Sequence, residues 1–329
     1  MVQRRAGGPR LIEWTGERCV PWTPQVPVAY EHYHRYLWAA PLVAGRRVLD
    51  LASGEGFGAA ILAGAAAEVI GIDIDQHTVE HSDLNYSAPN LEFKVGSALD
   101  LSEFDDDSFG AVVAFEMIEH LADQDRMLAE AERVLTNDGL LILSTPDRLM
   151  YSEAQQQDNP FHERELTEPE LRTLLASHFG QVALWGQRVA VGSRISAIDE
   201  LAAERAQAVF VERSGDEWRL AGEPAPVYLV AVASDAPFDP PPAESNLVDV
   251  GLELIRSKDR ELEAERAAHT AAAEAHQAEL QAQARAAEDS LREQLAPMQT
   301  VGWSLYTRLA RILRSGRRTI LGLLSRGQR

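Results

Sequence analysis

The chain alternates short apolar runs with longer stretches in which apolar residues recur at helical spacing. Apolar runs of strand length are typical of parallel strands buried on both faces, and helical stretches between them are typical of crossover connections. The pattern predicts a doubly wound α/β fold with a Rossmann-like sheet. The expected strands lie around 48–49, 69–72, 91–95, 111–115, 140–144, 182–185 and 227–232, and the expected helices around 76–86, 123–135 and 168–177, besides an alanine-rich helix after the first strand.

Residues 1–45 precede the first expected strand and contain an aromatic helical stretch, AYEHYHRYLWAAPLV. Helical spacing places Tyr30, Tyr33, His34 and Leu37 near one face of this helix. Two interpretations stay open for the segment. It is either a helix that packs on the sheet or a lid that covers a ligand.

The chain changes character after the last expected strand. Residues 46–234 hold the alternating pattern, with an insertion at about 190–226 that carries its own predicted helix near 197–210. Residues 235–246 form a proline-rich linker. Residues 247–295 are rich in Ala, Glu, Gln and Arg and predict a long helix. Coiled-coil-like spacing predicts self-association of this helix through Leu280, Ala284, Ala287, Leu291 and Leu295.

Residues 297–329 form a basic amphipathic tail that contains arginines and no acidic residue. Two partners stay open for such a segment: another protein, or a membrane surface that takes up the apolar side chains while the arginines meet anionic headgroups. The apolar residues that alternate with arginine include Trp303, Leu305, Leu309, Ile312 and Leu313.

Composition narrows the class of protein. The 329 residues carry a formal net charge of -20, which argues against nucleic acid as the main partner. The single cysteine, Cys19, excludes an internal disulfide and fits a reducing compartment. The sequence shows neither an apolar run long enough to span a bilayer nor the apolar core of a signal peptide. These features predict a cytoplasmic protein.

Glycine is concentrated in the stretch RRVLDLASGEGFGAAILAGAAAEVIGIDID, which begins at Arg46. Here a short apolar run ends in Asp50, a glycine-rich turn follows, and a later apolar run ends in Asp73. This order is typical of nucleotide-binding crossovers, with a generic α/β turn as the alternative. An acid beside the loop disfavours a pyrophosphate and favours a cationic ligand. An acid at the end of the second strand can accept hydrogen bonds from both hydroxyls of a ribose.

The spacing Asp50-x-x-x-Gly54-x-Gly56 resembles the first motif of the class I S-adenosylmethionine-dependent methyltransferases, an acid followed by a Gly-x-Gly-x-Gly turn. Ala52 stands where that family most often has its first glycine. The resemblance implies a seven-stranded sheet that ends in an antiparallel pair, S-adenosylmethionine as the cofactor, and an enzyme that transfers a methyl group.

By the same resemblance, the cofactor contacts several loops at the ends of the strands. Asp73 would bind the ribose, and Ser97 stands where the family often has an acid that contacts the adenine amine. That contact must therefore come from the serine or from the backbone. The implied cofactor-binding set is Asp50, Ala52, Gly54, Gly56, Asp73, Ile74, Ser97, Ala98, Phe115 and Glu116.

A second group of polar residues follows the fourth expected strand. Glu116, Glu119 and His120 are spaced i, i+3, i+4, so one helical turn would bring them to one side, and His162 follows the fifth strand. In parallel sheets these loops meet at the carboxyl ends of the strands. Glu119, His120 and His162 are therefore the candidate catalytic residues, with either histidine as the base for a hydroxyl acceptor.

Two carboxylates and two imidazoles can also hold a divalent ion that orients and acidifies a hydroxyl. The metal-binding set would then be Glu116, Glu119, His120 and His162, with Mg²⁺ or Mn²⁺ as the ion. The spacing resembles the EhhEH motif of metal-dependent small-RNA 2′-O-methyltransferases and of some sugar O-methyltransferases. Metal-free relatives also carry Glu-His at this place, so both mechanisms stay open.

Further segments, together with the motifs above, extend over about the first 190 residues: Glu17-Arg18-x-Val20-Pro21, Glu31-His32-x-His34-Arg35-Tyr36, Ser144-Thr145-Pro146 and Asn159-Pro160-Phe161-His162. Together they resemble bacterial methyltransferases associated with cell-surface polysaccharide assembly. This narrower resemblance implies a sugar hydroxyl of a glycan as the acceptor, work at the inner membrane face, and contact of the tail with the membrane or with a glycosyltransferase. The alternatives are a small-molecule acceptor, such as a quinone precursor or secondary metabolite, and a non-catalytic cofactor-binding scaffold.

Overall fold

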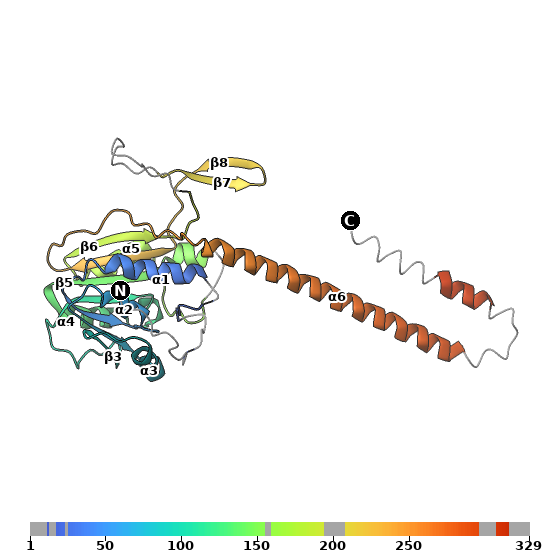
Figure 1. Cartoon of the computed structure of the whole chain (residues 1–329), viewed down its shortest axis with the longest axis horizontal. Helices are drawn as coiled ribbons and strands as arrows, with labels where there is room; N and C mark the ends of the chain where they lie inside the picture. Colours follow the sequence, from blue (N-terminus) through green and yellow to red (C-terminus); the bar gives the residue numbers. More distant parts are fainter. Residues whose placement is uncertain are drawn as a thin grey trace. The chain divides into compact units, whose positions relative to one another are not determined.

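The computed structural model describes residue 12 and residues 18–23, 26–154, 159–193, 208–295 and 307–315. The chain divides into two units, Met1–Gly251 and Leu252–Arg329. The first unit contains the strands and the shorter helices, and the second begins with a long helix (Figure 1).

One seven-stranded sheet forms the centre of the first unit, in the order β3-β2-β1-β4-β5-β9-β6. The first five of these strands run parallel, and β9 is antiparallel to both of its neighbours. The predicted doubly wound α/β sheet with an antiparallel pair at its end is therefore confirmed. The strands are β1 (Arg47–Leu51), β2 (Glu68–Asp73), β3 (Leu91–Val95), β4 (Phe109–Phe115), β5 (Leu135–Pro146), β6 (Gln181–Gln187) and β9 (Tyr228–Ser234).

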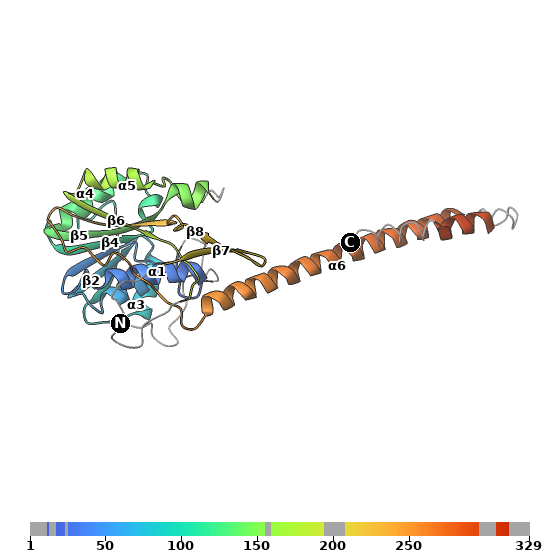
Figure 2. The ribbon, with the colours of Figure 1, turned by 90° about the horizontal axis from the view of Figure 1, so that it is seen from above.

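Helices cover both faces of the sheet (Figure 2). Side chains alternate along a strand, so neighbouring residues such as Val48 and Leu49 enter different apolar clusters. One cluster includes residues of α1, α2 and α3, and the other includes residues of α4 and α5. The helices are α1 (Val26–Ala39), α2 (Phe57–Leu62), α3 (Gln76–Asn85), α4 (Gln124–Val134) and α5 (Glu168–Ala176), with a 3-10 turn at Ile118–His120 and a π-helical turn at Leu149–Glu153.

The insertion between β6 and β9 contains a hairpin that the sequence analysis did not predict. The two strands are β7 (Phe210–Ser214) and β8 (Glu217–Ala221), which pair antiparallel. Gly215, with φ of 60°, supplies the left-handed backbone that this short turn requires. The predicted helix near 197–210 is wrong at its end, because Phe210 lies in β7, and its residues 197–207 lie outside the described part of the chain.

The second unit confirms the predicted long helix. This helix, α6 (Glu253–Leu295), spans 43 residues and begins a few residues later than expected, after a turn in which the Asp249 side chain accepts a bond from the Gly251 N–H. Leu280 and Leu291 are exposed on it, so the predicted coiled coil stays a prediction. Residues 307–315 of the tail are helical. Across the described residues, no helix combines the length and apolarity needed to cross a membrane.

A close contact between α1 and α2 gives a first testable prediction. A Cβ atom added at Gly58 would overlap the ring of Tyr36. We expect Gly58→Ala to lower the free energy of unfolding by about 1–3 kcal/mol, as overpacking of a filled core does. Urea denaturation of the full-length protein measures the change. Gly192→Ala is the control, because its Cβ would meet no atom within 4 Å. Equal unfolding midpoints for the two variants would contradict this packing.

Candidate active site

The carboxyl ends of β1, β2, β4 and β5 bring the two groups of candidate residues to one edge of the sheet. In doubly wound sheets, ligands bind in the crevice outside this edge. The loop after β1 carries the glycines, and β2 ends in Asp73. The loop after β4 carries the Glu-x-x-Glu-His segment that ends at His120.

The glycine loop between β1 and α2 has a strained, left-handed backbone. Ala52, Gly54 and Gly56 have φ of 54°, 55° and 95°. At Gly56 a Cβ would also lie 2.9 Å from the side chain of Ser82, so glycine is required there. Ala52 adopts the same region with a Cβ, a conformation that costs about 1–2 kcal/mol. Alanine is therefore tolerated where the resemblance implies glycine.

Side chains of β2 and α3 hold this loop in place. Asp73 accepts hydrogen bonds from the Gly54 N–H (3.1 Å) and the Asp75 N–H (2.9 Å). Ser82 Oγ donates to the Gly54 carbonyl (3.0 Å). Next to Asp73, the apolar side chain of Ile74 is 78% exposed. Asp73 therefore fixes the loop. The exposed side chain of Ile74 beside it offers an apolar surface on which a flat ring can pack.

Glu55, in the same loop, is buried and bonded to two residues that sequence reasoning missed. Its Oε2 accepts a bond from the Tyr86 hydroxyl (2.7 Å), and its Oε1 lies 3.1 Å from His81 Nε2. His81 belongs to α3, and Tyr86 is the residue that ends this helix. Glu55 therefore ties the loop to α3.

Asp50 lies inside the fold, behind the glycine loop. The Tyr36 hydroxyl donates to its carboxylate at 3.2 Å. Burial, together with the charge of Asp73, raises the pKa of Asp50 to about 8, although the bond from Tyr36 opposes the shift. A cation that binds beside the loop favours the ionised carboxylate, so the site is suited to a positively charged ligand.

Arg35 of α1 reaches the end of β4. Its Nη1 donates to Glu116 Oε1 (2.6 Å) and to Ser144 Oγ (3.2 Å). The helix buries Glu31, Arg35, Tyr36 and Ala39, so two charged residues lie on its buried side. The sequence analysis did not single out this buried set.

The guanidinium of Arg35 is only partly used by these bonds. The residue is 2% exposed, and neither Nε nor Nη2 has a hydrogen-bond partner among the described residues. Buried polar atoms are normally bonded. Two unused donors on a buried cation therefore fit an anionic group such as a carboxylate.

The remaining predicted cofactor contacts lie at the same edge. Ser97, in the loop after β3, accepts a bond from the Leu99 N–H (3.2 Å), and Ala98 packs against the core. Phe115 ends β4 and packs edge-on against Tyr36, with ring centroids 4.9 Å apart. The structure therefore brings these positions to one edge, and their contact with a cofactor stays a prediction.

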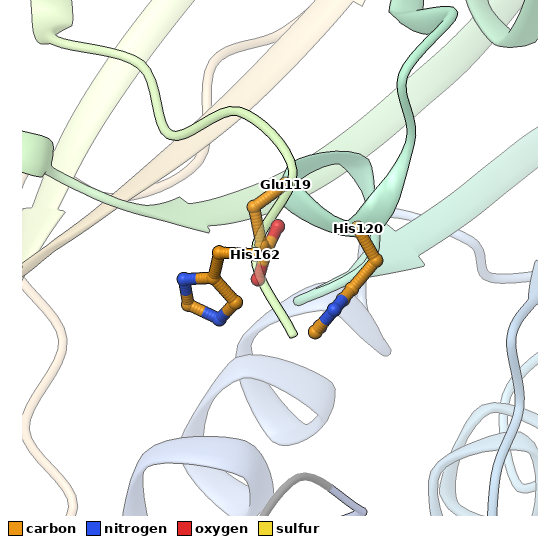
Figure 3. Close-up of side chains that lie close together, drawn as sticks. All are labelled: Glu119, His120 and His162. Carbon is orange, nitrogen blue, oxygen red and sulfur yellow. The ribbon is translucent and has the colours of Figure 1, made fainter. Parts of the chain in front are cut away.

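Glu119, His120 and His162 form a compact group across the site (Figure 3). One candidate ligand atom from each lies within 4.8 Å of the others. The loop that carries His162 is held to the 3-10 turn because the Glu119 carbonyl accepts bonds from the N–H groups of Glu163 (2.9 Å) and Arg164 (3.0 Å). Residues far apart in sequence thus meet as predicted.

Glu116 does not join this group, which corrects the predicted set of four. The prediction assumed one helical turn from Glu116 to His120. Glu116 instead has φ of 51°, and the 3-10 turn begins only at Ile118. The backbone therefore directs the Glu116 carboxylate toward Arg35 and Ser144, whose hydroxyl donates to it at 2.7 Å.

Both imidazoles are held by acceptors on Nδ1. His120 Nδ1 lies 2.9 Å from the Phe161 carbonyl oxygen, which can only accept, so this nitrogen carries the proton. His162 Nδ1 lies 2.6 Å from a carboxylate oxygen of Glu165. The neutral tautomer of each ring therefore has its lone pair on Nε2.

Several supporting residues of this group were missed from the sequence. Glu165 also accepts a bond from Ser152 Oγ (2.7 Å), and the Tyr151 ring stacks on His162 with centroids 5.6 Å apart. Thr145 Oγ1 donates to Glu119 Oε2 (3.0 Å). The spacing of these residues along the chain carries no signal of their proximity.

Residues 49–143 match the model of a family described as "Methyltransferase domain". A protein of Mycobacterium tuberculosis described as "Probable S-adenosylmethionine-dependent methyltransferase" is 37% identical over 187 residues, which cover 54% of this chain and 65% of that protein. The chain thus spans slightly less than two thirds of this curated relative.

Two further similarities were found. A "Ubiquinone biosynthesis O-methyltransferase" of Xanthomonas oryzae is 34% identical over 115 residues, which cover 34% of this chain and 48% of that protein. A solved structure from Thermotoga maritima, described as a SAM-dependent methyltransferase and possible histamine N-methyltransferase, is 18% identical with a TM-score of 0.46. The matched region covers 64% of this chain and 92% of the chain in that structure.

Proposed function

We propose that this chain, whose residues 49–143 match the model of a methyltransferase domain, is a class I S-adenosylmethionine-dependent methyltransferase that O-methylates a sugar hydroxyl of a glycan. The observation that carries the proposal is the pairing of two sites at one sheet edge. The glycine loop with Asp50 and Asp73 suits the cofactor, and we assign the group of Glu119, His120 and His162 to the acceptor.

The residues around the glycine loop match the three polar parts of the cofactor. Asp73 has acceptor capacity left for the ribose hydroxyls, since each carboxylate oxygen can accept more than one bond. A sulfonium or an ammonium beside the loop would favour the ionised form of Asp50, whose pKa is raised to about 8 by burial. Arg35 offers two buried donors that fit the carboxylate of the methionine part.

The chemistry assigned to the second group is proton removal during an in-line displacement. The acceptor oxygen attacks the methyl carbon, the carbon–sulfur bond breaks, and S-adenosylhomocysteine leaves. The hydroxyl proton passes to the Nε2 lone pair of His120 or His162, and the acceptors on Nδ1 stabilise the resulting imidazolium. A hydroxyl acceptor must lose its proton, so the presence of two candidate bases favours an oxygen acceptor.

The glycan acceptor is supported by the resemblance of several sequence segments to methyltransferases of polysaccharide assembly, and by the acidic composition, which suits an uncharged sugar better than RNA. A small-molecule acceptor is the second candidate. The similarity to a ubiquinone biosynthesis O-methyltransferase supports it.

Release of S-adenosylhomocysteine by the full-length protein tests the proposed function. Lipid-linked or free oligosaccharides and phenolic quinone precursors are offered as acceptors, and mass spectrometry locates the added methyl group. Methylation of an oligosaccharide hydroxyl supports the proposal. Methylation of the phenol alone selects the second candidate. Cofactor binding without transfer to any acceptor would favour a scaffold.

The basic tail supports a further proposal, peripheral attachment to the cytoplasmic membrane face. Ile312 is 65% exposed on the described helix of residues 307–315, which also carries Arg308, Arg311 and Arg314. Each arginine adds about 1 kcal/mol of attraction to an anionic leaflet, and the apolar side chains add insertion. Self-association through α6 also stays a proposal.

Flotation with liposomes tests this attachment. At low salt we expect the full-length protein to float with vesicles that contain anionic lipid, and a protein that ends at Ser234 to stay in the dense fraction. Methyl transfer to soluble acceptors should persist in the shortened protein. If the full-length protein also fails to float at low salt, the tail is instead a docking helix for a protein partner.

A further inference from the structure

We propose that Glu119, His120 and His162 bind one divalent transition-metal ion. The role of the ion in methyl transfer rests on the proposed function, but the binding of the ion does not. Two imidazoles and one carboxylate from two loops form the ligand set of open metal sites, in which further positions remain for water or substrate. Their candidate ligand atoms already lie within 4.8 Å of one another (Figure 3).

The orientation of both imidazoles supports the proposal. A histidine that binds a metal usually donates its other ring N–H to a carboxylate or a backbone carbonyl, which fixes the tautomer. His120 donates to the Phe161 carbonyl and His162 to Glu165, at 2.9 and 2.6 Å. Both rings therefore present Nε2 as the metal-binding atom.

The charge of Glu119 is the second support. The residue is 1% exposed, and its carboxylate accepts a bond from Thr145 but has no salt bridge among the described residues. The charge of Arg35 acts on Glu119, but Arg35 is paired with Glu116. A buried carboxylate without a paired cation is costly, and a divalent ion compensates its charge.

Asn159 closes the group on the side of His162. Its Oδ1 accepts a bond from the Phe161 N–H (3.0 Å), so the amide nitrogen faces His162 Nε2 at 3.0 Å. The amide therefore occupies the lone pair that an ion would use. Metal binding must rotate this side chain away, and we infer that Asn159 acts as a placeholder for the ion.

The donor atoms also indicate the class of ion. Imidazole nitrogen suits ions such as Fe²⁺, Co²⁺ and Zn²⁺, whereas Mg²⁺ prefers oxygen ligands throughout. Mn²⁺ accepts nitrogen and oxygen ligands together. Of the two ions expected from the sequence, Mg²⁺ and Mn²⁺, the ligand set therefore favours Mn²⁺. A bound ion lowers the pKa of a coordinated hydroxyl. The imidazoles then serve as ligands, and their role as base applies to the metal-free protein.

Cobalt binding tests the site without any reaction. We expect the chelator-treated, full-length protein to bind one equivalent of Co²⁺ with a saturable visible absorption band. Zn²⁺ should abolish the band, and a large excess of Mg²⁺ should leave it. His162→Ala and His120→Ala should each abolish it, and His276→Ala, an exposed histidine of α6, should not.

A matched pair of substitutions separates metal binding from general stability. Glu165→Gln should weaken Co²⁺ binding about 10-fold to 100-fold, because the amide no longer supports the basicity of His162. Glu163→Gln, an exposed acid two residues away, should leave it unchanged. S-adenosylmethionine binding by calorimetry, measured on the same samples, reports the fold and the cofactor site independently.

The proposal is overturned if no saturable band forms, or if the band survives both histidine substitutions. Displacement of Co²⁺ by Mg²⁺ would overturn the assignment to transition metals. If the wild-type protein binds Co²⁺ but does not bind S-adenosylmethionine, the result would contradict the proposed function and would still support the metal site.

Discussion

Replacing His162 with alanine is expected to lower kcat about 100-fold to 10,000-fold, the range that a positioned acid or base contributes. The substitution removes the Nε2 to which the proposed function assigns the hydroxyl proton and the further inference assigns the ion. The glycine loop is built from other residues, so the dissociation constant of S-adenosylmethionine should change little. Single-turnover kinetics and titration calorimetry measure the two effects separately.

His178→Ala is the matched control, because this histidine lies on the same unit but bonds to the surface acids Asp125 and Glu132. It should keep full turnover. A chelator distinguishes the two roles of His162: loss of activity that Mn²⁺ restores indicates a ligand, and activity indifferent to chelator indicates a base. Turnover that persists in His162→Ala would refute both roles.

Replacing Asp73 with alanine is expected to weaken S-adenosylmethionine binding by about 100-fold or more. Each charge-assisted bond to a ribose hydroxyl contributes about 1.5–3 kcal/mol, and about 1.4 kcal/mol corresponds to a factor of ten. The same carboxylate holds the Gly54 N–H, so the loop also loses an anchor. Titration calorimetry on the folded variant gives the affinity.

Asp73→Asn separates the two contributions. The amide keeps one oxygen that can accept from Gly54 but loses the charge, so an intermediate affinity is expected. Asp105→Ala, an exposed acid in the loop before β4, should bind the cofactor as the wild-type protein does. Unchanged affinity in Asp73→Ala would disprove the ribose contact.

The sheet was predictable because its signals are local. Parallel strands buried on both faces appear as apolar runs, and β3 begins and ends at the expected residues 91 and 95. The glycine loop was predictable for the same reason, since a left-handed backbone at Gly54 and Gly56 selects glycine directly. Helix α6 follows from composition alone.

Three features of the structure could not be read from periodicity. The contact of α1 with the end of β4 is a bond between Arg35 and Glu116, which are 81 residues apart. The position of Glu116 depends on a backbone φ of 51° that interrupts the expected helical turn. The hairpin of β7 and β8 depends on pairing between strands whose side chains are largely exposed, so no apolar pattern marks it.

The sequence by itself therefore determined the order of the seven strands of the main sheet and of the helices between its parallel strands, the glycine loop, and which loops carry Asp73, His120 and His162. These are set by short-range preferences of the backbone and by the alternation of apolar residues. Only the tertiary structure decided which polar groups meet: Glu165 with His162, and Arg35 with Glu116. Such bonds join residues from different loops, and their geometry exists only once the sheet has brought those loops to one edge.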